Sequence, residues 1–530
     1  MTGSPSSHRH VVIALACGIG VTLCWFLLTW RYGLDLADEG YYWYGSQRVL
    51  RGEVPIRDFL AYDIGRYLWA AAIMFVVGDE GIFGARLAAI VFQALSVCVG
   101  TWLALWALQE KLSAARTIGF AVAVALILNI WATPYYKSYD YGTCILIVAM
   151  TVLILTSRSP ARWCGAGVIL GLAAVMGRNH GVYGAASALL ALGFVLFKQG
   201  NRRAVLRPAL AFIGGTILGF SPTFFMGLAK PGFLDALAAG VIEHVHSVAG
   251  ATNIPLPVPW PWNVEHGKNG WVIWASEVAK GVGFIALLLV PVLTLLAMLR
   301  KRIAGFTELH YLLTASAFVG LVYSHYAYSR ADLVHLAVSI VPILLILFCY
   351  NTLGRMVVPV AIGVLGFSVL AVGQDSTIIN SKLFGRTTKT VVIDGSTLYT
   401  YPFIVYDIVD SRRALATVPG AQANFLAVPN LPGLYAINRS RMGIWEIYAL
   451  SHRDAGFEQA ELARLAKMPP KMVLLSNHAL DDQPQLRYSV IHPVTYKWIV
   501  DNYEREKQKP MSDLEVYVRK ESMPAQSAQR

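Results

Sequence analysis

The chain has 530 residues, of which 56% are hydrophobic and only 14% are charged. This balance lies far from that of a soluble globular domain and is typical of a protein that crosses a membrane several times. The formal net charge of +12 would suit a nucleic-acid-binding protein. However, much of the basic excess falls in short segments between hydrophobic runs, where membrane orientation and anionic lipid explain it. We therefore expect a polytopic α-helical membrane protein that does not bind nucleic acid.

Hydrophobic runs long enough to cross a bilayer recur from the amino-terminal region to Val372. The first run has no small-residue cleavage site, which favours an uncleaved span over a signal peptide. A run at 67–77 is too short to cross and is expected to lie at the interface as a re-entrant or juxtamembrane helix. We expect about eleven spans, at residues 11–30, 82–108, 117–132, 141–156, 163–176, 182–197, 208–228, 279–299, 309–323, 333–350 and 356–372.

Lysine and arginine residues are concentrated in every second loop between these spans. They are Lys111, Arg116, Arg158, Arg162, Lys198, Arg202, Arg203, Arg207, Arg300, Lys301, Arg302 and Arg355. Because such residues are retained in cytoplasmic loops, we expect a cytoplasmic amino terminus and an extracytoplasmic carboxyl-terminal segment. The first outer loop breaks this trend, and binding of an anionic substrate would explain its basic residues, which are Arg31, Arg48, Arg51, Arg57 and Arg66.

An acidic pair, Asp38 and Glu39, follows the first span by only a few residues and precedes a run of aromatic residues. A carboxylate at the edge of the hydrocarbon layer is costly unless it has a function. A carboxylate among aromatic rings can accept a proton from a substrate. We therefore take Asp38 and Glu39 as the candidate catalytic residues.

Other titratable and cationic side chains occur in the remaining outer loops. The candidate substrate- or phosphate-binding residues are Asp58, Tyr62, Asp63, Arg66, Lys137, Arg178, His180, Arg330 and His335. Their convergence from several loops on one face of the membrane favours an active site. Taken singly, a lysine or arginine at a helix end also serves to anchor a span among lipid headgroups.

A divalent metal is a further possibility, with Asp38, His244 and His246 as candidate ligands. The spacing of the two histidines is compatible with metal ligation but equally with a hydrated helix face. The six cysteines all lie in hydrophobic runs without a C-x-x-C pair, which indicates core residues and not disulfides or metal ligands.

The segment Asp38-Glu39-Gly40-Tyr41-Tyr42 resembles the first-loop acidic motif of a known family. The family comprises the polyprenyl-phosphate-sugar-dependent glycosyltransferases of the GT-C fold, in particular bacterial relatives of protein O-mannosyltransferases and lipid A aminoarabinose transferases. Residues 61–67 are similar to the family's loop segment before an interfacial helix, and residues 84–87 to the opening of the next span. The family's pair of prolines is absent from that loop segment, where Asp63-Ile64-Gly65 stands.

The resemblance implies a GT-C-like fold with interfacial helices in the first outer loop and a sugar donor carried on a polyprenyl phosphate. In such enzymes the first-loop carboxylate activates the acceptor hydroxyl, and the reaction inverts the anomeric centre. Asp38 would be this base, and Glu39 would orient the acceptor or a neighbouring group. Cationic side chains would stabilise the negative charge that develops on the departing lipid phosphate, with Lys137, Arg178 and Arg330 as first candidates. The acceptor would be a glycolipid, a polysaccharide or a protein of the cell envelope, outside a bacterial inner membrane.

Composition changes after Val372, where hydropathy falls and charged residues return. We therefore expect a membrane domain at 1–372, a linker at 373–400, an extracytoplasmic α/β domain at 401–520 and a disordered tail at 521–530. The α/β domain is expected to contain helices at 404–416, 456–466 and 493–503 and strands at 423–428, 471–476 and 514–518.

Two other functions remain open at this point. One is a transporter or flippase for lipid-linked sugars, although this class usually has polar groups near the bilayer midplane and two related halves. In this sequence Gln93 and Asn129 are the only conspicuous amides in the spans, and no internal repeat is visible. The other is a non-catalytic subunit of a polymer-assembly complex. Neither a G-x-G-x-x-G nor a Walker motif occurs, which argues against a cytoplasmic nucleotide site.

Overall fold

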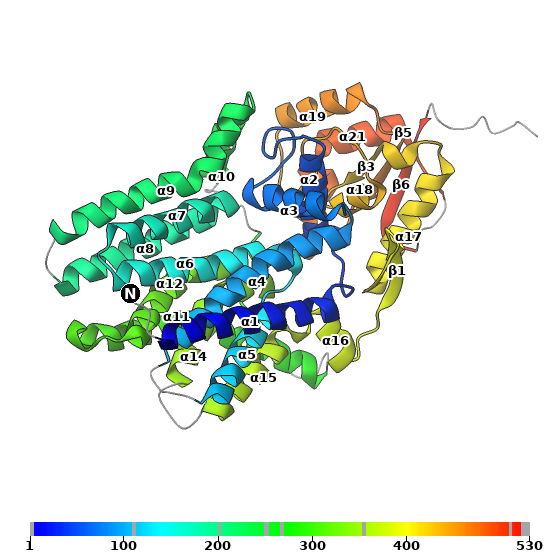
Figure 1. Ribbon diagram of the computed structural model, residues 1–530. Coiled ribbons are helices and arrows are strands. Elements are labelled where there is room, and N and C mark those ends of the chain that lie inside the picture. Colours follow the sequence, from blue (N-terminus) through cyan, green and yellow to red (C-terminus); the bar gives the residue numbers. More distant parts are fainter. Residues whose placement is uncertain are drawn as a thin grey trace, which may run out of the picture. The chain divides into compact units, whose positions relative to one another are not determined.

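The computed structural model describes residues 5–108, 113–199, 203–247, 254–265, 270–351, 357–507 and 511–520 (Figure 1). The expected tail at 521–530 lies outside these residues. The chain forms two compact units. The helical unit comprises Met1–Trp30, Tyr62–Arg66 and Arg86–Arg386, and the α/β unit comprises Arg31–Ala61, Tyr67–Ala85 and Thr387–Arg530. The α/β unit thus contains most of the first outer loop together with the carboxyl-terminal segment.

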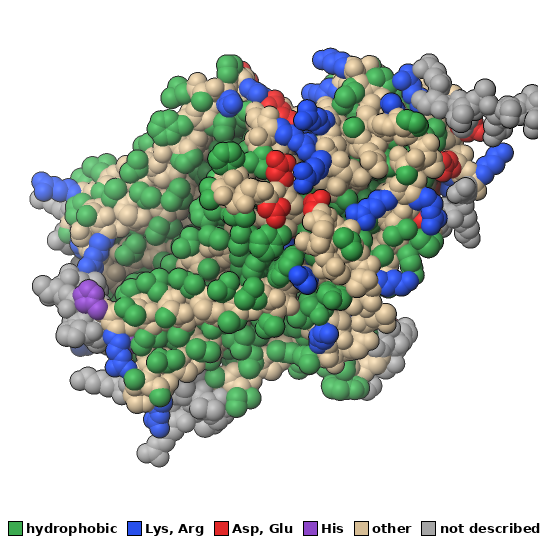
Figure 2. All heavy atoms as spheres, turned by 45° about the vertical axis from the view of Figure 1, so that its right-hand side comes forward, with side chains coloured by type: hydrophobic (Ala, Val, Ile, Leu, Met, Phe, Trp, Pro, Cys, Tyr) green, Lys and Arg blue, Asp and Glu red, His purple; other side chains and the backbone are tan. Residues whose placement is uncertain are grey.

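The helical unit is built from long hydrophobic helices. Their bounds are α1 Pro5–Thr29, α4 Ile82–Trp106, α5 Ala114–Trp131, α6 Ser138–Thr156, α7 Pro160–Met176, α8 Arg178–Gln199, α9 Arg203–Ala229, α10 Phe233–Ser247, α11 Trp271–Arg300, α12 Glu308–Ser329, α13 Leu333–Ser339, α14 Val341–Asn351, α15 Val357–Gly373 and α16 Thr377–Leu383. Hydrophobic side chains cover most of the face of this unit that Figure 2 shows, as expected of a surface that meets lipid.

Within the described residues, seven helices are long and apolar enough to cross a membrane, or up to nine if each of two bent helix pairs is one span. The bent pairs are α13 with α14, at 49°, and α15 with α16, at 102°. All of the expected spans fall on helices of the helical unit. The count differs from eleven partly because α7, with 17 residues, is shorter than a full span.

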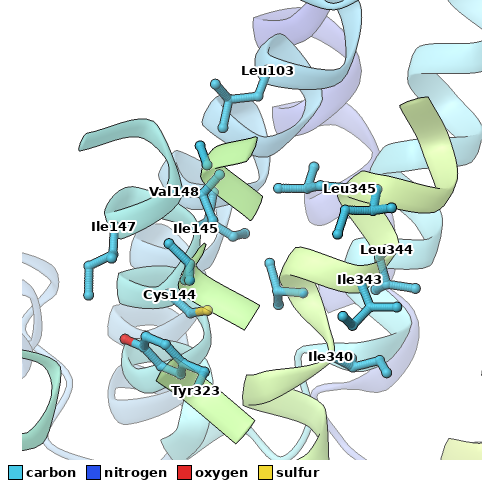
Figure 3. Close-up of a cluster of buried hydrophobic side chains, with 14 of the residues drawn as sticks. Leu103, Cys144, Ile145, Ile147, Val148, Tyr323, Ile340, Ile343, Leu344 and Leu345 are labelled. Carbon is cyan, nitrogen blue, oxygen red and sulfur yellow. The ribbon is translucent and has the colours of Figure 1, made fainter. Parts of the chain in front are cut away.

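Two kinds of packing hold the helical unit together. Figure 3 shows one part of its core, where Cys144 and Ile145 of α6 lie near Tyr323 of α12 and Leu344 of α14, all of them buried. Elsewhere α7 and α9 meet through small residues. A Cβ atom on Gly167 would lie 2.8 Å from Thr216 N, and one on Gly171 would lie 2.7 Å from Gly219 C. Such close backbone approach is typical of helix pairs in membranes.

The α/β unit contains a four-stranded sheet in the order β3-β4-β6-β5. Its strands are β3 Phe425–Val428, β4 Met472–Ser476, β5 Tyr503–Arg505 and β6 Leu514–Arg519. β3 and β4 are parallel and the other pairs are antiparallel. The helices of the unit are α2 Asp38–Leu50, most of α3 Gly65–Val77, α17 Pro402–Thr417, α18 Pro432–Asn438, α19 Ala455–Lys467, α20 Tyr488–Ile491 and α21 Pro493–Asn502.

The helices and strands expected in the carboxyl-terminal segment agree with α17, α19, α21, β3, β4 and β6. The structure adds two details to these expectations. Asp38 and Glu39 do not lie in a loop but begin the helix α2. The segment expected to be a linker contains α16 and a hairpin formed by β1 Lys389–Ile393 and β2 Ser396–Thr400.

Candidate functional site

The acidic pair of the first loop has a third carboxylate beside it, Asp35. Its Oδ1 accepts a hydrogen bond from Ala37 N at 2.9 Å, and its Oδ2 accepts one from Asp38 N at 3.1 Å. In return, Asp35 N donates to Glu39 Oε2 at 3.3 Å. These bonds satisfy backbone N–H groups at the start of α2, where the helix dipole also favours negative charge. Sequence reasoning missed Asp35, although its position just before an acidic helix start is typical of a capping residue.

The surroundings of Asp35 change its ionisation. Burial, followed by the negative charges of Asp38 and Glu39, raises the pKa of Asp35 to about 7, although the backbone N–H donors oppose this shift. Asp35 therefore changes its charge near neutral pH. Glu39 is only 5% exposed, so a buried carboxyl group lies at the amino terminus of α2.

Asp38 also contacts the carboxyl-terminal part of the chain. The hydroxyl group of Tyr448 donates a hydrogen bond to Asp38 Oδ1 at 2.6 Å. The Tyr448 ring stacks on Tyr41, with 4.9 Å between the ring centroids and an interplanar angle of 17°. Asp38, Tyr41 and Tyr448 all belong to the α/β unit. The surroundings of Asp38, the candidate base, thus come from two parts of the sequence that are far apart.

Helix α2 is held within the α/β unit by close backbone contact with α18. Gly433 N donates to Leu36 O at 2.8 Å, and a Cβ on Gly40 would lie 2.5 Å from Gly433 Cα. On the same helix, the buried Arg48 pairs with Glu53 and donates to Ile444 O at 2.8 Å. Glycine at position 40 is therefore required because any side chain would overlap the backbone of α18.

Asp58 has a structural environment of its own. It forms an ion pair with Arg57, with 2.8 Å between Arg57 Nε and Asp58 Oδ1, and accepts a hydrogen bond from Val54 N at 2.7 Å. Although partial burial opposes ionisation, these donors lower the pKa of Asp58. Asp58 belongs to the α/β unit, as do Asp38 and Glu39.

The helical unit contains a second group of charged side chains centred on Asp140, in the first turn of α6. His180 Nε2, in the first turn of α8, donates to Asp140 Oδ1 at 2.8 Å. Arg66 Nη2, near the start of α3, lies 3.1 Å from the same oxygen. Lys137 Nζ, just before α6, lies 3.9 Å from Asp140 Oδ2. Helix starts therefore bring these four side chains together.

Asp63 extends this group on one side. Its Oδ1 accepts a hydrogen bond from Arg178 N at 2.7 Å and lies 3.8 Å from Arg178 Nε, while its Oδ2 lies 3.5 Å from Arg66 Nη2. Burial raises the pKa of Asp63, although Arg66 and Arg178 oppose the shift. We call these residues the charged cluster: Asp63, Arg66, Lys137, Asp140, Arg178 and His180.

Tyrosines of α12 join the charged cluster to a neighbouring group. The Tyr323 hydroxyl lies 2.8 Å from His180 Nδ1, and Lys137 Nζ donates to the Tyr326 hydroxyl at 3.0 Å. The Tyr326 ring lies 4.8 Å from the ring of His335. Tyr326 is therefore the link between the charged cluster and His335.

His335 belongs to a group at the start of α13 with Asp332 and Arg330. His335 Nδ1 donates to Asp332 Oδ1 at 2.7 Å, and Arg330 Nε donates to Asp332 Oδ2 at 2.8 Å. Burial opposes ionisation of Asp332, but the hydrogen bonds and charge of His335 and the charge of Arg330 lower its pKa to about 2. Asp332 thus remains an anion that accepts hydrogen bonds from both partners.

Five of the expected binding residues come together in the charged cluster, and Arg330 and His335 lie beside it in the same unit. Tyr62, also in the helical unit, is 43% exposed. Sequence reasoning did not select Asp140, Asp332, Tyr323 or Tyr326. The spacing of three residues between Lys137 and Asp140 at a helix start was a usable signal for Asp140, because such residues are neighbours on a helix.

The structure gives no support for a metal site. In the described residues, no group of three or more histidine, cysteine, aspartate or glutamate side chains could hold a metal ion. This includes the surroundings of Asp38. The side chains of His244 and His246 lie outside the described part of the chain.

Comparisons with known proteins identify the fold. The chain is similar to ArnT from Cupriavidus metallidurans bound to undecaprenyl phosphate, with a TM-score of 0.52 and 14% sequence identity over 96% of this chain and 97% of that chain. The apo state of ArnT gives a TM-score of 0.50 at the same identity and coverage. The oligosaccharyltransferase AglB from Archaeoglobus fulgidus gives 0.45, with 10% identity over 98% of this chain and 75% of that chain.

No protein-family model matches the sequence, and a search of curated proteins finds no match. The similarity to ArnT, at low sequence identity but over nearly the full length of both chains, establishes the fold. The expected fold class is confirmed: the chain is a multi-pass membrane protein with a GT-C fold and a carboxyl-terminal region that contains a β-sheet.

Proposed function

We propose that the protein is an integral-membrane glycosyltransferase that moves a sugar from a polyprenyl-phosphate donor to a hydroxyl group of a cell-envelope acceptor. The charged cluster is the observation that carries this proposal. Its three cationic side chains, Arg66, Lys137 and Arg178, face two carboxylates, which leaves an excess of one positive charge. Buried ionisable groups in a membrane protein are costly, and they mark a functional site by default.

A lipid-linked phosphate is the anion that suits this setting, because it combines a hydrocarbon chain with a charged headgroup. Arginine forks and the lysine ammonium group bind phosphate oxygens through charge-assisted hydrogen bonds. Arg178 is 33% exposed, so its guanidinium group is accessible, while Asp63 and Asp140 are buried and hold the cations in place. The presence of undecaprenyl phosphate in an ArnT structure of the same fold supports this ligand class.

In the proposed reaction, Asp38 removes the proton from the acceptor hydroxyl as its oxygen attacks the anomeric carbon of the donor sugar. The bond between that carbon and the phosphate oxygen breaks, and the configuration inverts. The departing lipid phosphate gains negative charge, which cationic side chains stabilise. Glu39 and Asp35 hold the start of α2, and Arg330 and His335 provide further polar contacts for the donor.

The acceptor class covers glycolipids, polysaccharides and proteins. The positively charged alternate loops support a location in a bacterial inner membrane, with the amino terminus in the cytoplasm and the carboxyl-terminal domain in the periplasm. In this arrangement the donor would be presented at the outer leaflet.

The proposal is tested by release of free polyprenyl phosphate. Wild-type protein and Asp38→Asn are reconstituted with an extract of native membrane lipids, and the released lipid phosphate is followed over time. Asparagine keeps the size of the side chain but cannot accept the proton, so we expect release to fall by roughly 10²- to 10⁴-fold. Asp454→Asn is the matched control, because Asp454 caps α19 through its side chain and asparagine caps a helix equally well.

Release by wild type and by Asp454→Asn, but not by Asp38→Asn, supports the proposal. Equal release by Asp38→Asn would show that the base is another group, with Glu39 and Asp35 as the next residues to substitute. If wild type binds the donor but releases no lipid phosphate, and instead moves the donor between leaflets of a vesicle, the protein is a transporter.

A further inference from the structure

The carboxyl-terminal domain contributes a side chain directly to the surroundings of Asp38. The Tyr448 hydroxyl donates to Asp38 Oδ1 at 2.6 Å, across 410 positions of sequence. This is short for a hydrogen bond from a neutral hydroxyl and is typical of a bond to a charged carboxylate. The stacking of Tyr448 on Tyr41 fixes the plane of the ring that carries this hydroxyl.

Tyr448 lies in a segment without regular helix or strand between α18 and α19, and buried ionic contacts hold this segment. Glu446 Oε1 accepts a hydrogen bond from Arg453 Nε at 2.7 Å, and Glu446 Oε2 accepts one from His492 Nε2 at 2.7 Å. Glu461 Oε2 accepts hydrogen bonds from Trp445 N and Glu446 N at 3.0 and 3.1 Å. The backbone two residues before Tyr448 is therefore fixed by α19 and by the start of α21.

The same segment also holds the far end of the first loop. Trp445 Nε1 donates to Ile56 O at 3.0 Å, and Leu60 N donates to Trp445 O at 2.7 Å. The contact between Tyr448 and Asp38 is thus one part of a larger set of hydrogen bonds. Because its neighbours already fix both segments, removing the Tyr448 hydroxyl alone leaves the first loop in place.

We propose that Tyr448 is a positioning residue for Asp38. This inference rests on the proposed role of Asp38 as the base. Its hydroxyl orients the carboxylate and stabilises the charged form that accepts the acceptor's proton. Tyr448 keeps its own proton throughout the reaction, and the acceptor's proton goes to Asp38.

The test compares Tyr448→Phe with wild type and with Tyr503→Phe. Phenylalanine keeps the stacking on Tyr41 and removes only the hydroxyl. Tyr503 is a matched control because its buried hydroxyl donates to Pro470 O at 2.8 Å within the same unit. We expect Tyr448→Phe to lower kcat for lipid-phosphate release by about 10- to 100-fold, as for loss of a hydrogen bond to a charged group. We expect KM for the donor to change little, because the Tyr448 hydroxyl acts on the base and not on the donor.

The pH profile separates positioning from a general loss of structure. Activity requires the charged carboxylate, so it falls at acidic pH. Without the Tyr448 hydroxyl the charged form is less stable, and the acidic limb of the profile moves to higher pH. Tyr503→Phe is expected to keep the wild-type rate and the wild-type position of the acidic limb. A lower rate in Tyr448→Phe without a shift of the acidic limb of the pH profile would overturn the proposal. An unchanged rate in Tyr448→Phe, when Asp38→Asn is inactive, would also overturn it.

An infrared measurement distinguishes failure of this inference from failure of the proposed function. The difference spectrum between wild type and Asp38→Asn isolates the carboxylate bands of Asp38, whose titration needs no enzymatic activity. If Tyr448→Phe moves this titration to higher pH, the hydrogen bond stabilises the charged form even where no lipid phosphate is released. An unmoved titration would overturn the inference whatever the outcome of the release assay.

Discussion

Asp140 in the helical unit and the aspartates at the start of α2 in the α/β unit are held in different ways. In the helical unit, Asp140 is paired with cationic side chains from other segments, and its side chain is 6% exposed. In the α/β unit, Asp35 is held by backbone N–H groups, and Asp38 accepts a hydrogen bond from a neutral hydroxyl. A charge buried in a low-dielectric environment is stabilised by a counter-charge, and a buried carboxyl group without one takes up a proton more readily. We therefore propose that the charged cluster of the helical unit binds an anion and that the acidic start of α2 exchanges a proton.

The largest effect is expected from breaking the ion pairs of the helical unit with Asp140→Asn. This substitution leaves Arg66, Lys137 and His180 without their shared carboxylate, which lowers the free energy of unfolding by about 3–5 kcal/mol. Thermal unfolding in detergent measures the change.

Glu277→Gln is the control for Asp140→Asn, because Lys280 keeps its contact with Asp375 at 2.7 Å when Glu277 loses its charge. We expect this control to cost below about 1 kcal/mol. If the two variants unfold at the same temperature, ion pairing does not hold the charged cluster.

A smaller but still large effect is expected from Gly40→Ala, which tests how the α/β unit holds the acidic helix. The added Cβ overlaps the backbone at Gly433, and neither backbone can move easily, so we expect a loss of about 3 kcal/mol in unfolding free energy. Gly443→Ala is the control, since nothing lies within 4 Å of its Cβ position. Equal stability of the two variants would contradict the packing of α2 on α18.

The dependence of stability on pH tests the part of the comparison that concerns proton exchange. Because the pKa of Asp35 is raised to about 7 in the folded protein, the folded state binds this proton more tightly than the unfolded state. The resulting stability is fully present below about pH 4 and is lost as the pH rises through about 7. Burial and the charges of Asp513 and Asp410 raise the pKa of Asp407 to about 7 as well. We expect the melting temperature to fall between about pH 5 and 8.

Asp35→Asn removes one of these two contributions, so the fall in melting temperature becomes shallower. Asp407→Asn should reduce the slope in the same way. Asp482→Asn, at a position whose side chain is 93% exposed, is the control. A melting curve for Asp35→Asn that runs parallel to that of wild type across this pH range would refute the linkage.

Much of the architecture was predictable because it follows from local sequence patterns. The expected spans fall on helices of the helical unit, and six expected helices and strands of the α/β unit occur where they were placed. Hydropathy and alternation of side chains act over a few residues, so a single sequence is enough to show them.

The partners of these residues were not predictable. Arg66 and Asp140 are 74 positions apart, and Asp38 and Tyr448 are 410 positions apart. Asp58 was grouped with Asp63 from its place in the loop, but it pairs with Arg57 in the α/β unit, while Asp63 lies in the charged cluster. Neighbours in sequence can belong to different units, because a chain that leaves one core can enter another within a few residues.

The sequence by itself determined that this is a multi-pass membrane protein with an acidic pair after its first span, basic alternate loops and a carboxyl-terminal α/β segment. Hydrophobic burial and charge placement decide these features locally. Only the tertiary structure decided that the first loop packs into one unit with the carboxyl-terminal segment and that Asp140 gathers the cations. Contacts between distant segments depend on how whole elements pack, and packing is satisfied only when the complete core has formed.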